Sequence, residues 1–135
     1  MINTAQDWKR VREAQISAVG GKMTEDDYKY LMIIDETIIG YYDDIIEKAK
    51  SKVDALTETI SSNPNADPKI KASLSNWSKL YRNALAERAN YQKELNEYTL
   101  QSMLAPLERR KTQLEQEATR LNNIISEQES RSINV

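Results

Sequence analysis

Two long stripes of apolar side chains constrain the fold of this chain more than any other feature. The first recurs every three or four residues from Tyr28 to Ile60, and the second from Ile70 to Tyr98. That spacing is helical, and at 1.5 Å per residue a helix over residues 25–61 is about 55 Å long. Such a helix needs an equally long partner, so we expect the two stripes to pack against each other.

The connection between the stripes has the residues of a tight turn. Pro64 lies in an Asn-rich stretch, Asp67 can cap the following helix, and Pro68 fits its first position. A short connection between two helices makes them antiparallel neighbours. The sequence therefore predicts an antiparallel hairpin of helices over residues 25–61 and 68–104.

A shorter helix is expected before the hairpin, over residues 4–19. Thr4 is positioned to cap its start, and Gly20 and Gly21 are expected to end it, because glycine readily adopts a left-handed conformation. The expected buried face consists of Trp8, Val11, Ala14 or Gln15, and Ala18.

A further helix is expected after the hairpin, over residues 106–126. Pro106 removes one backbone hydrogen bond, so the preceding helix should kink or restart there. Beyond it a new heptad row predicts a seam that packs on the first helix, on the other side of the hairpin, or on another chain. We predict this row as a protein-binding seam through Leu107, Leu114, Leu121 and Ile125. Residues 126–135 have no sustained pattern, and a frayed tail is expected.

Composition agrees with a helical protein and removes most catalytic chemistry. Charged residues make up 30% of the 135 residues, with only three glycines and three prolines, which favours long helices. Cysteine and histidine are both absent, which excludes thiol nucleophiles, imidazole bases and zinc sites built on these residues. We expect a single all-α domain over residues 1–135, elongated and coiled-coil-like, with no enzymatic activity, cofactor or metal site.

Charge is distributed unevenly along the two long helices. Residues 21–62 hold ten acidic residues against five lysines, a balance of −5, whereas residues 63–104 hold six basic against four acidic residues, a balance of +2. This asymmetry suits two segments that face each other, and it provides no basic surface for nucleic acid. Apolar runs are only three or four residues long, so neither a membrane span nor a signal peptide is expected. The expected location is the cytoplasm, or outside the cell after export without a cleaved signal.

One local stretch resembles a known family. The turn from Asn63 to Pro68, followed by the run LSNWSKLYRNA from Leu74 to Ala84, is similar to the needle subunits of bacterial type III secretion systems. Those subunits are helical hairpins that polymerise around a secretion channel. The resemblance implies a hairpin motif at Pro64, Asp67, Pro68, Trp77 and Tyr81, and it implies assembly rather than chemistry. Needle subunits end soon after their second helix, whereas this chain continues.

The functional expectation is therefore a non-catalytic helical protein that assembles with itself or binds a protein partner. The resemblance places it in a bacterial secretion apparatus. The alternative is a chaperone or adaptor that sequesters a client helix in a groove. An enzyme would need a concave pocket that a thin hairpin scarcely offers.

Overall fold

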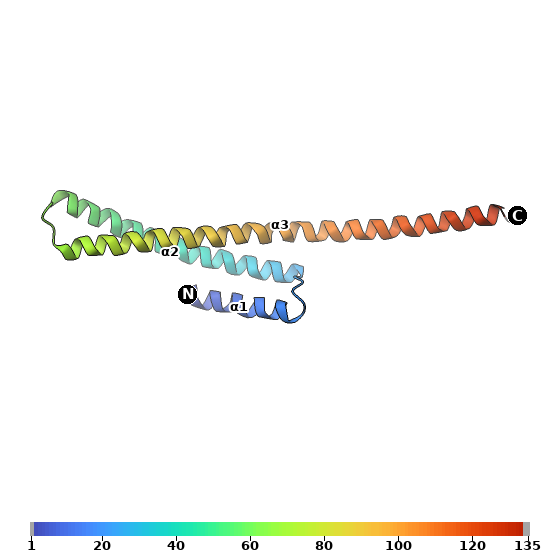
Figure 1. Cartoon of the computed structure of the whole chain (residues 1–135), viewed down its shortest axis with the longest axis horizontal. Helices are drawn as coiled ribbons and strands as arrows, with labels where there is room; N and C mark the ends of the chain where they lie inside the picture. The colour runs from blue at the N-terminus through green and yellow to red at the C-terminus, as the bar shows by residue number, and fades with distance from the viewer. Residues whose placement is uncertain (1, 134–135) are drawn as a thin grey trace. The chain divides into compact units, whose positions relative to one another are not determined.

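Three helices make up almost all of the described chain, which covers residues 2–133 of a computed structural model. They are α1 (Ile2–Ala18), α2 (Glu25–Ser62) and α3 (Pro68–Ile133), and no strand occurs between residues 2 and 133 (Figure 1). The predicted all-α class is confirmed. Contacts divide the chain into two compact units, with the boundary between Thr99 and Leu100, where the sequence predicted one domain over residues 1–135. The two units are described separately below.

In the first unit, α2 and the N-terminal part of α3 lie side by side and run in opposite directions (Figure 1). The paired side chains show the antiparallel order, because the α3 partner moves toward the C-terminus as the α2 residue moves toward the N-terminus. The pairs are Lys48 with Trp77, Asp43 with Arg88, Tyr42 with Tyr91, and Tyr28 with Tyr98. The predicted hairpin is confirmed, and every residue of both predicted stripes is buried or half-buried.

The ends of the hairpin helices follow from their capping residues. The Thr24 hydroxyl accepts a hydrogen bond from the Asp27 amide at 3.2 Å, and the Asp27 carboxylate accepts one from the Thr24 amide at 2.9 Å. At the other end, the Asp67 carboxylate accepts a hydrogen bond from the Lys69 amide at 2.9 Å. The reciprocal bonds of Thr24 and Asp27 and the single bond to Asp67 satisfy amides that the first helical turn leaves without partners. They fix the start of each helix, and the cap at Asp67 is the predicted one.

The predicted cap of the first helix is wrong, although its predicted end is correct. Helix α1 begins at Ile2, so Thr4 lies inside the first turn. Gly20 and Gly21 both have positive φ angles, of 102° and 80°. The Gly21 amide donates to the Ile16 carbonyl at 2.9 Å, which is the bond that closes a helix ending in glycine.

The predicted buried face of α1 is also wrong. Trp8 and Val11 are 55% and 57% exposed, whereas the buried residues are Ala5, Lys9 and Ile16. Ala5 joins Ile34 and Ile38 in the hydrophobic core, with Tyr42 and Tyr91 packed against it. Helix α1 therefore docks on the hairpin through a face that carries a lysine, and the reason lies in the charges described below.

Helix α3 continues through Pro106 instead of ending at residue 104 and restarting at residue 106. Proline inside a helix costs about 3 kcal/mol, but residues on both sides of it, such as Leu104, Ala105 and Glu108, are strong helix formers. The helix also includes residues 126–133, where a frayed tail was expected, and positions 134 and 135 lie outside the described residues.

Close packing between α2 and α3 predicts a large effect of added volume at Ala84. This side chain is only 3% exposed, so Ala84→Leu should destabilise the protein by about 1–3 kcal/mol through overpacking. The measurement is urea unfolding followed by circular dichroism at fixed protein concentration. Ala89→Leu on the same helix is the control, because Ala89 is exposed. Equal stability of the two variants would contradict the hairpin packing.

Candidate functional site

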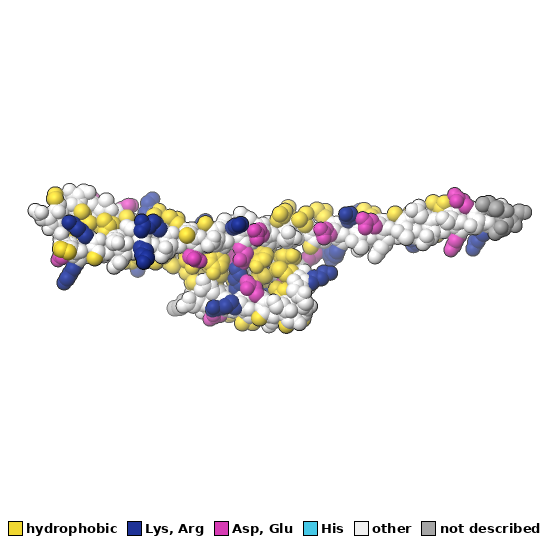
Figure 2. Space-filling view, in the orientation of Figure 1, with side chains coloured by type: hydrophobic (Ala, Val, Ile, Leu, Met, Phe, Trp, Pro, Cys, Tyr) yellow, Lys and Arg dark blue, Asp and Glu magenta, His cyan; other side chains and the backbone are white. Residues whose placement is uncertain are grey.

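A buried ion cluster joins all three helices in the first unit. The Lys9 ammonium lies 3.1 Å from the Asp35 carboxylate of α2, and it also pairs with the Glu94 carboxylate of α3. Asp35 is fully buried, and only a tenth of the Lys9 side chain is exposed. Figure 2 shows charged and hydrophobic side chains gathered where α1 lies against the hairpin.

Aromatic side chains surround the cluster. The Lys9 ammonium lies 4.8 Å from the centre of the Tyr91 ring, which stacks on Tyr42 at 5.9 Å. The Gln6 side-chain amide donates to the Tyr91 hydroxyl at 3.0 Å. Burial, followed by the nearby Asp35 carboxylate, raises the pKa of Tyr98 to about 12. The Tyr91 ring is therefore a cation–π partner of Lys9, and the raised pKa keeps Tyr98 neutral at physiological pH.

The buried carboxylate explains which face of α1 is covered. Burial raises the pKa of Asp35, and the hydrogen bond from Lys9 opposes that rise. One Asp35 oxygen, Oδ2, has no hydrogen-bond partner among the described residues. An uncompensated buried charge is costly, so a cation must face this position. Lys9 supplies it, and the more apolar Trp8 face remains in solvent.

The geometry of this cluster is that of an ion pair shared by one cation and two carboxylates. Lys9 pairs with both carboxylates, and no group of three potential metal-binding residues forms between residues 2 and 133. The adjoining hollow is lined by Gln6, Lys9, Arg10, Glu13 and Tyr91.

The sequence carried a signal for this cluster that hydrophobicity alone did not reveal. Asp35 lies four residues after Leu31 and three before Ile38, so it belongs to the inward-facing row of α2. Lys9 likewise lies four residues after Ala5 and seven before Ile16. A charged residue in the inward row of one helix, matched by an opposite charge in the row of another, indicates a buried pair.

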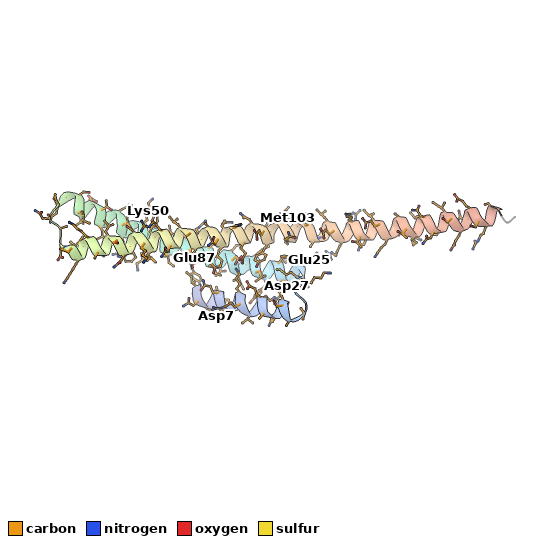
Figure 3. The ribbon with its side chains drawn as sticks, in the orientation of Figure 1. Asp7, Glu25, Asp27, Lys50, Glu87 and Met103 are labelled. Carbon is orange, nitrogen blue, oxygen red and sulfur yellow. The ribbon has the colours of Figure 1, made fainter. Side chains whose placement is uncertain are left out.

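A second ion pair fixes the junction between α1 and α2. The Arg12 Nε lies 2.9 Å from the Asp27 carboxylate, and the Arg12 guanidinium lies 4.5 Å from the centre of the Tyr30 ring. Figure 3 shows Asp27 at the start of α2, close to α1. The hydrogen bond from the Thr24 amide, together with Arg12, lowers the pKa of Asp27.

The residues of the predicted hairpin motif stabilise the turn and the start of α3. Pro64, Asp67 and Pro68 lie at the exposed connection, while Trp77 and Tyr81 are half-buried along α3. The Lys48 ammonium of α2 lies 6.0 Å from the centre of the Trp77 ring. These positions account for the motif through packing and capping alone.

The predicted protein-binding seam lies entirely in the second unit. We call Leu107, Leu114, Leu121 and Ile125 the C-terminal seam. These side chains are 62%, 57%, 47% and 52% exposed, and every side chain described from residue 106 to residue 132 is exposed. A shallow hollow on this surface is lined by Leu107, Arg110, Lys111, Leu114, Glu115 and Ala118.

Comparison with protein-family models, curated proteins and solved structures finds no match to this chain. Between residues 2 and 133, no helix combines the length and the apolar character that crossing a membrane requires.

Removing the cation of the buried cluster should be strongly destabilising. Lys9→Met keeps the packing of the aliphatic stem but leaves Asp35 buried without a cation, which should cost about 3–5 kcal/mol at pH 7. Because the pKa of Asp35 is then raised further, the native state binds the proton more tightly than the unfolded state. The variant should therefore gain stability as the pH falls and lose it as the pH rises through the folded-state pKa.

Urea unfolding of the Lys9→Met variant between pH 5 and pH 8 tests the predicted loss of stability and its pH dependence. Two further variants serve for comparison. Adding Asp35→Leu to Lys9→Met should restore most of the lost stability, since an apolar pair can replace a buried ion pair. Lys29→Met, at an exposed position on α2, should change stability by less than about 0.5 kcal/mol. If Lys9→Met costs no more than Lys29→Met, the cluster does not hold α1 in place.

Acid should remove the contribution of the α1–α2 junction. Because the folded-state pKa of Asp27 lies below the ordinary 3.8, its stabilisation is complete above pH 4 and is lost as the pH falls through the lowered value. Asp27→Asn should thus cost about 1 kcal/mol near pH 6 and close to nothing near pH 2. Thermal unfolding of this variant and of Asp26→Asn, the exposed neighbour, should give different pH profiles. Superimposable profiles would contradict the role of Asp27.

Proposed function

We propose that this protein is a non-catalytic helical component that assembles with other protein chains through the C-terminal seam. The observation that supports this is the exposure of Leu107, Leu114 and Leu121 at intervals of seven residues along one helix. Side chains at this interval share one helical face. Leucines exposed in such a row lose contact with water when a second helix covers them, which favours association.

The first unit supports the same proposal, because charged groups at the contacts between its helices are paired with one another. Lys9 pairs with Asp35 and Glu94, and Arg12 pairs with Asp27. The resemblance of residues 63–84 to needle subunits suggests a bacterial secretion apparatus as the setting for this assembly.

A chaperone or adaptor is the second candidate, and the exposed face of α1 favours it. Trp8, Val11 and Val19, which lies just beyond the end of α1, are 55%, 57% and 78% exposed. A client helix could cover such a surface with its own apolar face. An adaptor would form a fixed small oligomer that binds a client helix one-to-one, whereas a self-assembling component would gain mass as its concentration rises.

Light scattering of the full-length protein tests the assembly proposal. The wild type should exceed the monomer mass, and Leu114→Gln combined with Leu121→Gln should return it to the monomer while leaving the helical circular dichroism of the protein largely intact. Gln116→Ala combined with Asn123→Ala, on the opposite side of the helix, is the control and should keep the wild-type mass. A wild-type protein that stays monomeric at all concentrations, or a mass that the leucine changes do not alter, would overturn the proposal.

A further inference from the structure

The C-terminal seam continues toward the hairpin as a complete heptad pattern. Leucines occupy one position of every heptad, at residues 100, 107, 114 and 121. Four residues after each leucine comes the second core position, held by Leu104, Lys111, Ala118 and Ile125. Alternating steps of four and three residues define the d and a positions of a coiled coil. The pattern spans residues 100–125, which corresponds to about 39 Å of helix.

Resting on the proposed function, we infer that the partner of the C-terminal seam is a second copy of this chain, aligned in parallel and in register as a two-stranded coiled coil. Three observations carry this inference. They are the shape of the hollow in the seam, the charges beside it, and the placement of Pro106.

The hollow in the seam has the outline of the cavity that a coiled-coil side chain enters. Its first four residues, Leu107, Arg110, Lys111 and Leu114, follow the i, i+3, i+4, i+7 spacing of such a hole. The last four, from Lys111 through Leu114 and Glu115 to Ala118, form the next hole by the same rule. In a parallel, in-register pair, the first hole receives Lys111 of the second copy and the second receives its Leu114.

The charges beside the core favour the parallel orientation. A g-position residue faces the e-position residue five places further along a parallel partner, so Arg110 faces Glu115 of the second copy, twice per dimer. Within one helix the same two residues are too far around the axis to pair. In an antiparallel pair centred on the same hollow, the e positions face each other and bring Glu108 against Glu115. Like charges at that distance are unfavourable, so the antiparallel alternative is disfavoured.

Lys111 adds selectivity for two strands. A single lysine at an a position can extend its ammonium to solvent at the edge of a two-stranded core, whereas more strands would enclose it. Arg110 and Lys111 of each copy are balanced by Glu108 and Glu115, so this layer carries no net charge. The lysine thus sets the number of strands at a cost in affinity.

Pro106 leaves this seam unobstructed. It occupies the c position, one residue before the d-position Leu107, on the side of the helix that faces solvent in a coiled coil. Pro106 is exposed, and its missing amide therefore lies away from the core positions on either side of it.

Charge exchange between two copies is the decisive experiment. Arg110→Glu and Glu115→Arg should each weaken the full-length dimer about tenfold in sedimentation equilibrium, since each places like charges in both contacts. An equimolar mixture of the two variants should regain wild-type affinity, because the heterodimer has an attractive pair in both contacts. High salt should reduce these differences. A mixture that associates no better than the single variants would overturn the parallel arrangement.

Disulfide cross-linking gives an independent measurement, because the chain contains no cysteine. Gln128 is the next d position, so Gln128→Cys should form an intermolecular disulfide in a parallel pair. The control Gln116→Cys, at the outward f position, should remain reduced. Cross-linking of neither variant in a protein whose mass still depends on Leu114 would reject this geometry and leave the proposed function standing. A monomeric wild type would reject both, and a trimeric or tetrameric mass would reject the two-stranded coil alone.

Discussion

The buried carboxylate of Asp35 determines how the first unit is built. It lies in the inward row of α2 with no exposure to water, and desolvation of a charge costs more than any single apolar side chain can return. The nearby cation must therefore come from a helix that packs over this position. Helix α1 meets that requirement with Lys9, and α3 completes the pair with Glu94. One electrostatic constraint thus selects the face of α1, its register, and its position against both arms of the hairpin.

Hydrophobic spacing predicted the parts of the fold in which apolar burial dominates. The stripes of α2 and α3, the Thr24 capping box and the turn at Asp67 follow directly from residue types at fixed intervals. The same reasoning selected Trp8 and Val11 on α1 and was wrong, because it ranked faces by hydrophobicity and gave no weight to a buried ion pair. Ala5, Lys9 and Ile16 also recur at helical spacing. This row is recognised as a buried face only when it is considered together with Asp35, which lies 26 residues away from Lys9 and on another helix.

Continuity of α3 through Pro106 has a related explanation. Proline was expected to kink or end the helix, since it removes one hydrogen bond and crowds the preceding turn. That penalty is local, whereas the helix propensity of the residues around it accumulates over many positions. At the tail, residues 126–133 lack an apolar period and still continue the helix. Periodicity indicates which face packs, and it says less about where a helix made of good helix formers ends.

The two halves of α3 differ in the side chains along their seams. Along the hairpin, the seam includes the aromatic residues Trp77, Tyr81 and Tyr91, which are half-buried. After Thr99 the core positions hold leucine, alanine and isoleucine together with Lys111, and no aromatic residue. A narrow aliphatic core suits two closely spaced helices with interlocking side chains. The seam residues of α3 thus change from aromatic to aliphatic at the unit boundary. This change agrees with the proposal that the hairpin covers the first seam and that a helix of a second chain covers the C-terminal seam.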